Sequence, residues 1–486
     1  MLRKVRIILA AVFFIGITLL FLDFTGTLHA WLGWMAKIQF LPAMLAANAV
    51  IIAALLLVTV LFGRIYCSII CPLGIMQDII SWVNGKRSRK NRYRFHFKKE
   101  RKWLRIGFMA IFFILMASGI HAIAMILAPY SAYGRIASNL FSPAYKWGNN
   151  LLAWFAERAD SYAFYSTEVW IKSIPTFIIA AASFLIIFIF AWKGGRAYCN
   201  NVCPVGTILG FFSRRSIFVP VIDTDKCRNC GLCGRQCKSS CIDMKKHIID
   251  YSRCVICMDC LDACKDGAIS YKTRYSTNKS TDAGRRAFLT SAVMTATAIG
   301  AKAVKSRELP LGAKGEVARG CRPVPAGAIS QKNFHDHCTA CQLCISVCPN
   351  EVLRPSSDLS TLMQPEMHFD KDYCRYDCTA CSNVCPTGSI RPVGPEERTA
   401  IQIGIAVINH DICIVNTDNV KCGNCARHCP AGAIRLVRRN PEDQESLMIP
   451  VVNEERCIGC GACEHLCPTK PISAIHIEGT QVHRTI

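Results

Sequence analysis

The sequence predicts a membrane α-helical domain with four spanning helices, followed by small α+β modules built around cysteine motifs. Three observations predict this fold class: long apolar stretches in the first half, an uneven charge distribution, and 30 cysteines in 486 residues. So long a chain is not a small secreted disulfide scaffold. Its hydrophobic content of 51% excludes a disordered chain.

Four apolar stretches are each close to the length that an α-helix needs to cross the hydrocarbon of a bilayer. They are Val5–Leu22, Leu41–Phe62, Trp103–Ala128 and Ile174–Trp192. We therefore predict a four-span membrane domain over residues 1–215. Alternatively, the first stretch is a cleaved signal peptide ending near Leu28-His29-Ala30, which would leave three spans.

Basic residues are concentrated beside these stretches. Residues 1–275 contain 34 Lys and Arg against 13 Asp and Glu, whereas residues 276–486 contain 23 against 21. Ten basic residues lie in the run 86–102, but only four lie in the segment 129–173. This pattern follows the positive-inside rule. We expect a protein of the bacterial inner (cytoplasmic) membrane, with the N-terminus and the 86–102 run in the cytoplasm and no nucleic-acid partner.

A nine-residue motif occurs twice, once after the second and once after the fourth apolar stretch. The copies are Tyr66-Cys67-Ser-Ile-Ile-Cys71-Pro72-Leu-Gly74 and Tyr198-Cys199-Asn-Asn-Val-Cys203-Pro204-Val-Gly206. Four thiols at one membrane face could be redox-active dithiols or extra cluster ligands. Alternatively, they are structural cysteines packed at helix ends. The sequence does not decide between these interpretations.

Two further cysteine motifs follow in residues 216–275, which we predict to be a cytoplasmic two-cluster ferredoxin domain. Both have the Cys-x2-Cys-x2-Cys-x3-Cys spacing of bacterial two-cluster ferredoxins, in which the fourth cysteine of each motif binds the other cluster. Zinc sites usually take two ligands from each of two loops, so the spacing favours iron–sulfur clusters. Cys241 is surplus and could replace Cys237. The predicted ligand sets are Cys227, Cys230, Cys233 and Cys264 for one [4Fe–4S] cluster, and Cys254, Cys257, Cys260 and Cys237 for the other.

Residues 321–486 contain four more motifs, each ending in Cys-Pro, and form a predicted four-cluster polyferredoxin domain. We therefore expect six clusters in α+β ferredoxin-like 4Fe-4S modules. The four motifs pair either in order or with the outer two around the inner two. Short strands at 433–437 and 474–477 follow the last two motifs, and Cys321 remains unassigned. The predicted ligands are Cys338, Cys341, Cys344, Cys348, Cys374, Cys378, Cys381, Cys385, Cys413, Cys422, Cys425, Cys429, Cys457, Cys460, Cys463 and Cys467.

The segment 276–320 between the two halves contains Gly284-Arg285-Arg286-Ala287-Phe288-Leu289, followed by a mildly apolar run. This pattern is typical of a twin-arginine export signal, here placed inside the chain as a signal or anchor. If the signal operates, the last four clusters face the periplasm and the first two face the cytoplasm. A cytoplasmic linker helix is the alternative.

With these motifs in order, residues 1–275 resemble the NapH-type quinol dehydrogenase membrane subunit, through YCSIICPLG, YCNNVCPVG and the two ferredoxin motifs. Residues 280–486 resemble the NapG-type periplasmic ferredoxin, through GRRAFL, RPVPAGAI at 322–329 and four cysteine motifs. The resemblance implies a fusion of two proteins that are usually separate chains. It implies electron transfer from quinol, in contact with membrane lipid and the quinol pool, to a periplasmic reductase of the nitrate-reductase kind. Without export, the partner would be a cytoplasmic oxidoreductase.

A quinol oxidation site must accept protons as well as electrons. His121 and His29, near the expected outer face, titrate in a useful range and are the candidate proton acceptors, although either could be a packing residue. The sequence contains no Cys-x2-Cys-His haem motif, no Gly-x-Gly-x2-Gly nucleotide loop and no P-loop. The competing function is an accessory protein that senses redox state or supplies electrons during metalloenzyme assembly.

Overall fold

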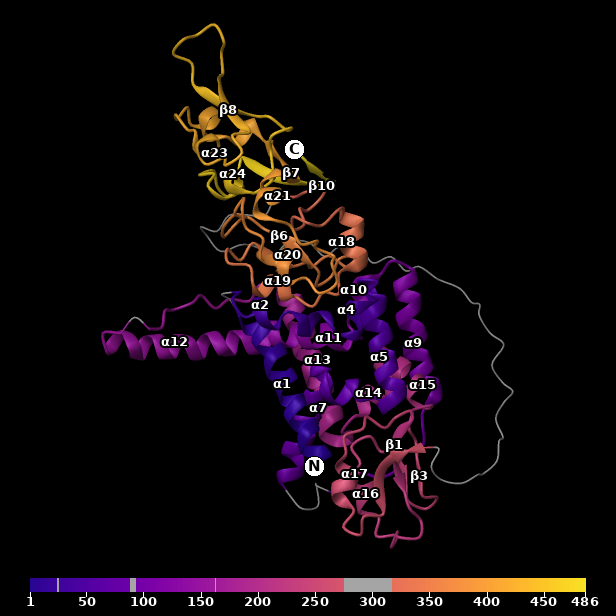
Figure 1. Ribbon diagram of the computed structural model, residues 1–486. Helices are drawn as coiled ribbons and strands as arrows, with labels where there is room; N and C mark the ends of the chain where they lie inside the picture. Colours follow the sequence, from indigo (N-terminus) through magenta and orange to yellow (C-terminus); the bar gives the residue numbers. More distant parts are fainter. Residues whose placement is uncertain (24–25, 88–92, 162, 275–316) are drawn as a thin grey trace.

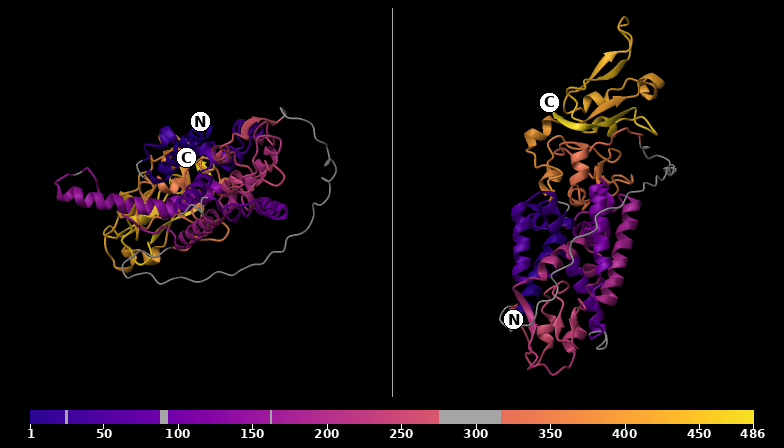
Figure 2. Two further views of the ribbon diagram at one scale, coloured as in Figure 1. Left: turned by 90° about the horizontal axis from the view of Figure 1, so that it is seen from below. Right: turned by 90° about the vertical axis from the view of Figure 1, so that its right-hand side faces the viewer.

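The computed structural model describes residues 1–23, 26–87, 93–161, 163–274 and 317–486. A layer of helices lies between two small cysteine-rich domains (Figure 1, Figure 2). Residues 218–274 form the domain at the end where the N-terminus lies, and residues 317–486 form the domain at the opposite end. The twin-arginine motif predicted at 284–289 lies outside the described residues.

The longer apolar helices run along the long direction of the helix layer (Figure 1). Two of them, α1 (Leu2–Leu22) and α13 (Ile174–Gly194), have 21 residues each and are long and apolar enough to cross a membrane. The other two, α5 (Ala49–Phe62) and α9 (Lys102–Ala117), are shorter, with 14 and 16 residues. The described residues therefore contain two candidate spanning helices where the sequence predicted four.

The expectation of one continuous helix in the second and third apolar stretches is wrong. In the second stretch, α4 (Phe40–Leu45) ends and α5 begins after Asn48, whose Oδ1 accepts a hydrogen bond from the Ile51 backbone N–H at 3.2 Å. This is an N-cap, which fixes a helix start. In the third stretch, Gly119 has φ +79° after the end of α9, and α10 (His121–Ala124) follows. A left-handed residue just past the C-cap ends a helix.

The remaining helices of the layer are short or lie across it. One of them, α12, projects sideways (Figure 1). Its Trp147, Leu151 and Phe155 are exposed and lie four residues apart, so they form one apolar face of the helix. Such a helix suits the surface of a bilayer. The remaining helices of the layer, α12 included, are α2 (His29–Leu32), α3 (Trp34–Lys37), α6 (Tyr66–Ile69), α7 (Pro72–Arg87), α11 (Pro129–Ile136), the π-helical η1 (Ala137–Phe141), α12 (Ser142–Arg158), α14 (Ala197–Asn201) and α15 (Pro204–Ser213).

The two-cluster domain is built on two antiparallel strand pairs. Strand β1 (Phe218–Ile222) pairs with β4 (Ile269–Thr273), with Phe218 opposite Thr273. Strand β2 (Ile242–Asp243) pairs with β3 (Ile248–Ile249). Two short helices, α16 (Leu232–Gln236) and α17 (Asp259–Ala263), carry cysteines.

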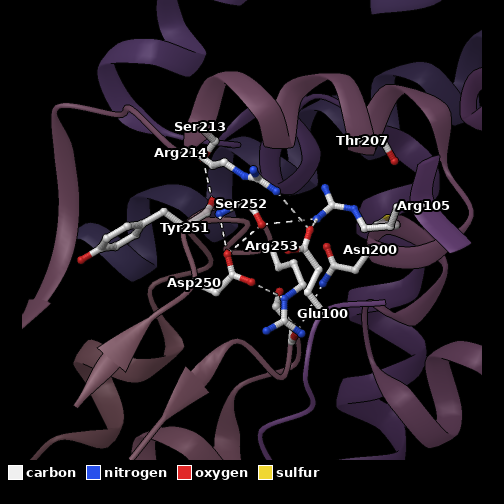
Figure 3. A network of polar contacts seen from close by, with 12 residues as sticks. Glu100, Arg105, Asn200, Thr207, Ser213, Arg214, Asp250, Tyr251, Ser252 and Arg253 are labelled. Atoms are coloured by element: carbon white, nitrogen blue, oxygen red, sulfur yellow. Dashed lines mark hydrogen bonds and ion pairs between the residues drawn. The ribbon is translucent and has the colours of Figure 1, made fainter. Parts of the chain in front are cut away.

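A polar network attaches the two-cluster domain to the helix layer (Figure 3). Arg105 of α9 donates to Ser252 Oγ at 3.3 Å, and it also donates to Glu100, which accepts from Arg214 at 3.3 Å. Ser252 Oγ in turn donates to Asp250 Oδ1 at 2.7 Å. This end of the 86–102 run and the two-cluster domain are therefore in direct contact.

The C-terminal domain has three two-stranded antiparallel sheets among its described residues. A buried core continues from the helix layer into it and includes Tyr133 on one side and Phe334 on the other. The strands predicted at 433–437 and 474–477 are confirmed as β8 and the start of β10, and they pair with β9 and β7. The strand pairs are β5 (Leu353–Pro355) with β6 (Pro365–Met367), β7 (Ile401–Ile408) with β10 (Ile475–Thr485), and β8 (Ile434–Arg438) with β9 (Met448–Val452). The helices are α18 (Gln331–His337), α19 (Leu343–Ser346), α20 (Ala380–Val384), α21 (Pro395–Ala400), the 3-10 turn η3 (His410–Ile412), α22 (Ile414–Thr417), α23 (Asn424–Arg427) and α24 (Ala462–His465).

Candidate metal centres

Four tight loops place the first three cysteines of each regular motif. In each loop, the residues two and four positions after the first cysteine have positive φ angles. They are Asn229 and Gly231, Ile256 and Met258, Ala340 and Gln342, and Gly459 and Gly461. This double left-handed turn aims backbone N–H groups at the sulfurs: the Ala340 N–H lies 3.4 Å from Cys338 Sγ. The third cysteine is the second residue of a short helix, as Cys344 is in α19.

The structure gathers the cysteines into six sets of four. Sets 2, 3, 5 and 6 each line a small cavity. The thiols of sets 1 and 4 lie close enough for their charges to interact. Set 1 is Cys227, Cys230, Cys233 and Cys264; set 2 is Cys254, Cys257, Cys260 and Cys237; set 3 is Cys338, Cys341, Cys344 and Cys385; set 4 is Cys374, Cys378, Cys381 and Cys348; set 5 is Cys413, Cys422, Cys425 and Cys467; set 6 is Cys457, Cys460, Cys463 and Cys429.

This arrangement corresponds to the motifs pairing in order, since set 3 takes its fourth thiol from the second C-terminal motif and set 5 takes its fourth from the last one. Neighbouring sets also touch. The Cys374 N–H donates to the Cys460 carbonyl at 3.0 Å, which joins sets 4 and 6. Cys344 lies near Cys381, and Cys463 lies near Cys425. The C-terminal sets therefore follow one another in the order 3, 4, 6, 5 away from the helix layer.

The thiol sets fit iron–sulfur cubanes better than single metal ions. Among the described residues, no three His, Cys, Asp or Glu side chains converge closely enough to hold one metal ion. A cubane spreads its ligands because each thiolate binds a different iron. Burial raises the pKa of Cys341 to about 11 and that of Cys460 to about 12. Without a metal these thiols would stay protonated, and cluster binding supplies the charge that stabilises the thiolates.

Cys241, surplus in the sequence, lies inside set 2. It is 1% exposed, and its Sγ is 3.5 Å from Cys237 Sγ. It also lines the same cavity as Cys254, Cys257 and Cys260. Both Cys237 and Cys241 are therefore placed to act as the fourth ligand.

The four cysteines of the repeated motif come together inside the helix layer. Cys67, Cys71, Cys199 and Cys203 are each 4–5% exposed, and their sulfurs lie close enough for their charges to interact. Polar hydrogens point at two of the sulfurs: Gln77 Nε2 lies 3.2 Å from Cys199 Sγ, and the Gly206 N–H lies 3.3 Å from Cys203 Sγ. The sequence predicted the two copies at the same membrane face and did not decide the role of their thiols.

The two histidines proposed as proton acceptors contact different partners. His29 Nδ1 is 3.2 Å from Asp23 Oδ2, and His121 Nε2 is 3.4 Å from Asp336 Oδ1 in the C-terminal domain. Neither lines the large cavity described next. Nothing in the structure brings these two side chains to a common site.

A cavity of about 870 Å³ lies between the helix layer and the C-terminal domain. Apolar side chains at helix ends form part of its wall, among them Phe21, Trp147 and Phe177, and Cys348 of set 4 lies in the opposite wall. Its size is within the range of small-molecule sites. Sequence reasoning missed this cavity, because its walls come from segments about 200 residues apart.

Glu351, three residues after Cys348, is the central polar group of the cavity. It accepts hydrogen bonds from Trp170 Nε1 and from Lys146 Nζ, the latter at 3.4 Å, and Lys172 Nζ lies 4.0 Å away. Burial alone would raise the pKa of this carboxyl group, but the Trp170 hydrogen bond and the two lysines outweigh it, so the pKa is lowered. The carboxyl group is therefore ionised at neutral pH.

Comparisons with known proteins agree on iron–sulfur chemistry. A model described as a 4Fe-4S binding domain matches residues 45–90 and 176–221, and one described as a 4Fe-4S dicluster domain matches residues 337–389 and 420–470. No solved structure matches the chain.

Three curated relatives illustrate the similarity. An uncharacterized protein of Methanocaldococcus jannaschii is 36% identical over 22% of this chain and 42% of its own length. The ferredoxin-type protein NapH of Haemophilus influenzae is 24% identical over 44% of this chain and 64% of its own length. The methylamine utilization ferredoxin-type protein MauM of Methylobacillus flagellatus is 32% identical over 29% of this chain and 62% of its own length. The chain thus spans between 42% and 64% of these relatives.

These matches and the cysteine motifs show an iron–sulfur electron-transfer protein with ferredoxin-type 4Fe-4S domains. It is similar to the NapH and MauM ferredoxin-type proteins, and it has two helices that are long and apolar enough to cross a membrane.

Proposed function

We propose that this chain takes electrons from quinol in the membrane and passes them through six [4Fe–4S] clusters, held by sets 1 to 6, toward a periplasmic reductase of the nitrate-reductase kind. In this proposal it is a fusion of a NapH-type membrane subunit with a NapG-type ferredoxin. Residues 1–215 cross the membrane four times, with α4–α5 and α9–α10 as broken spans.

The contacts at one end of the helix layer support the proposed orientation. Arg3 Nε is 2.8 Å from Asp259 Oδ1 of the two-cluster domain, and Arg253 Nη1 is 2.6 Å from the Lys98 carbonyl in the basic run. The N-terminus, the basic run and sets 1 and 2 therefore share one end, which the positive-inside rule places in the cytoplasm. Sets 3 to 6 lie at the opposite end, on the periplasmic side.

The observation that carries the quinol assignment is the large cavity beside Cys348. A quinol has an apolar tail and a polar ring, so it needs a pocket with apolar walls and a few polar groups. Phe21 and Leu22 at the end of α1 supply apolar wall, and Glu351 and Lys172 supply polar groups. The amphipathic helix α12 contributes Ser142, Pro143 and Trp147 to the same cavity, which puts the cavity at the level of the membrane surface.

Oxidation of quinol to quinone releases two electrons and two protons. Set 4, whose Cys348 lines the cavity, would hold the cluster that takes both electrons, one at a time, and the neighbouring sets 3 and 6 would hold the clusters that receive them next. Glu351 accepts one proton as a general base, and the lysines beside it keep the carboxylate ionised until then. The second proton passes to Asp372 or to water at the polar side of the cavity.

The variant Glu351→Gln tests this function in membrane vesicles that contain the full chain. The amide can still accept the Trp170 hydrogen bond but cannot take a proton. We expect quinol-driven bleaching of the cluster absorbance to slow about 100-fold or more, with unchanged iron content and normal reduction by dithionite. Glu397→Gln, at an exposed carboxylate that pairs with Arg391, is the matched control. Quinol reduction at the wild-type rate in Glu351→Gln would overturn the assignment of this cavity.

A further inference from the structure

Each copy of the repeated cysteine motif receives a hydrogen bond from an arginine that belongs to the other copy. Arg196 precedes Cys199 by three residues, and its Nη1 donates to the Cys67 carbonyl of the other copy at 2.7 Å. Arg64 precedes Cys67 by three residues, and its Nη2 donates to the Cys199 carbonyl at 3.2 Å. These reciprocal contacts are those of a two-fold arrangement within one chain.

Two glycines make this close approach possible. A Cβ atom on Gly74 would lie 2.3 Å from the Cys67 carbonyl oxygen and 2.4 Å from Arg196 Nη1. A Cβ atom on Gly206 would lie 2.3 Å from the Cys199 carbonyl oxygen and 2.8 Å from Arg64 Nη2. The final glycine of each motif is therefore required for the guanidinium of the other copy to reach the cysteine loop.

The buried charges around the four thiols do not balance. Arg64 is 0% exposed, its Nη1 donates to Asn200 Oδ1 at 2.8 Å and to the Ser252 carbonyl at 3.1 Å, and no carboxylate pairs with it in the part of the chain that the structure describes. Arg196 is also 0% exposed, and it shares the carboxylate of Asp78 with Arg6 and Lys238. Around the site, Arg3, Arg6, Arg196 and Lys238 pair with three carboxylates, Asp78, Asp259 and Asp262. With Arg64 there are five cations against three carboxylates, an excess of two positive charges.

A buried unpaired cation is costly, so the site calls for an anionic group. Four neutral thiols or two disulfides would leave the excess positive charge in place. A four-cysteine [4Fe–4S] cluster combines four thiolates with a core of about +2 and carries about −2 in total, which matches the excess. Each motif has only two cysteines, so the cluster needs both copies. Arg64 Nη2 at 3.7 Å from Cys67 Sγ adds a donor to a ligand sulfur.

The four thiols lie between set 2 and set 3. On one side, the Arg196 backbone N–H donates at 3.0 Å to the carbonyl of Lys238, the residue after Cys237. On the other side, Tyr198 Oη donates to the Leu127 carbonyl at 3.0 Å. Gly134 of α11 then packs on the Cys341 carbonyl, since a Cβ there would lie 2.4 Å from that oxygen. The four thiols thus lie between the two domains, with Tyr198, Leu127 and α11 between them and set 3.

We propose that Cys67, Cys71, Cys199 and Cys203 together hold a seventh cluster, a [4Fe–4S] cluster shared by the two motif copies, and that this cluster connects the clusters of the two ends electrically. In each step one electron leaves a reduced cluster and enters the next oxidised one, and no bond or proton is exchanged. The chain then carries electrons through the membrane as well as along one face of it. This assignment does not depend on quinol as the electron donor.

The test is an iron and acid-labile sulfide count on the full chain, purified without oxygen. The double variant Cys71→Ser/Cys203→Ser is expected to contain four irons and four sulfides fewer per chain than the wild type. Cys321→Ser is the matched control, because Cys321 belongs to none of the sets, and it is expected to lose none. An unchanged count, or a loss other than four, contradicts the assignment.

A second variant tests the same site without removing a ligand. Arg64→Gln takes away the unpaired cation, so one cluster is expected to become harder to reduce in an electron paramagnetic resonance titration, with the iron content unchanged. In vesicles, a membrane-impermeant reductant that reaches only sets 1 and 2 should reduce all clusters of the wild type. In the double cysteine variant it should reduce only those on its own side. Complete reduction of all clusters in that variant would contradict the proposal that electrons pass between the two ends through the four thiols.

Discussion

The two cluster-bearing domains are joined to the helix layer by different kinds of contact. The two-cluster domain has a hydrophobic core of its own, and hydrogen bonds and ion pairs such as those of Arg105 and Arg3 attach it to the helices. Two of its residues, Val255 and Cys257, also belong to the buried core of the helix layer. That same core extends through a much larger part of the C-terminal domain, with Phe334 among its members. Polar contacts weaken with changes of pH and salt more than apolar contacts do. The contact between the C-terminal domain and the helix layer should therefore depend less on pH and salt than that of the two-cluster domain.

The two domains nevertheless share one gradient of exposure. In each domain a buried set faces the helices, set 2 at one end and set 3 at the other. The outermost set of each domain is more open: Cys230 of set 1 is exposed, and Cys422 and Cys425 of set 5 are partly exposed. The thiols of set 4, between sets 3 and 6, are also partly exposed. If a soluble partner binds at either end, we expect it to contact set 1 or set 5.

The largest expected effect comes from removing a ligand at the inner end of one domain. Cys344→Ser is expected to remove the set 3 cluster and with it the electrical contact between the C-terminal sets and the four thiols of the helix layer. Cys230→Ser removes an exposed ligand at the outer end of the other domain and should leave transfer among the remaining clusters intact. Iron counts and cluster reduction from each side distinguish the two variants. Equal transfer defects in both would contradict the proposed order of the sets.

A pH effect of about 3 kcal/mol is expected at His483 in β10. Burial, together with the nearby Arg398 charge, lowers the pKa of this side chain to about 4. Neither ring nitrogen has a hydrogen-bond partner among the described residues. Because the unfolded chain binds a proton near pH 6.5 and the folded chain does not, the stability of the C-terminal domain should fall as the pH drops from 6.5 toward 4.

Thermal unfolding of the full chain between pH 7 and pH 5 measures this effect. The two-cluster domain is an internal comparison. Burial would raise the pKa of Asp250, but hydrogen bonds from Ser252 and Arg253 outweigh it and hold this pKa below 3.8, so its stabilisation persists above that pH. His483→Gln should remove the largest part of the pH dependence of the C-terminal domain in this window. A smaller part should remain, because burial also lowers the pKa of His335 and of His476. A dependence that persists undiminished in the variant would assign the effect to another group.

The smallest effect, about 1–3 kcal/mol, is expected at the apolar attachment itself. In Gly134→Ala the new methyl group would meet the Cys341 carbonyl and also the Phe21 ring, at 2.9 Å. We expect easier proteolytic separation of the C-terminal domain, with set 3 still loaded. Gly148→Ala in α12 is the matched control, since nothing lies within 4 Å of the added atom, and it should be neutral or stabilising. Similar behaviour of both variants would mean that α11 does not hold the C-terminal domain.

Cysteine spacing carried most of the information that the sequence held about the sites. A thiol such as Cys385 could be assigned to a neighbouring motif because ferredoxin loops exchange their fourth ligand by a fixed rule. The choice between paired and nested motifs needed the fold, since both use the same sixteen residues. The interruptions at Asn48 and Gly119 were not foreseen, because the stretches were judged by average hydropathy alone. Asn is a preferred N-cap residue and Gly is common just past a helix end, so both residues are breaks that the sequence could have indicated.

The large cavity was beyond sequence reasoning for a different reason. Its central carboxylate, Glu351, takes its importance from Trp170 and Lys146, which lie 181 and 205 residues away in the chain. His29 and His121 were chosen because histidine titrates near neutral pH, but residue type alone says nothing about which side chains share a space. Contacts between residues so far apart in the chain form only when the domains pack, so they could not be predicted from the sequence.

The reciprocal contacts of Arg64 and Arg196 have an evolutionary consequence. A motif whose cysteine loop is completed by the guanidinium of another copy cannot form its site alone. A shorter ancestral chain with a single copy would have had to associate with a second molecule, and its ligands would then have come equally from both subunits. Joining two copies in tandem removed the dependence on protein concentration. It also freed the two halves to diverge, so that only one of them now continues directly into a ferredoxin domain.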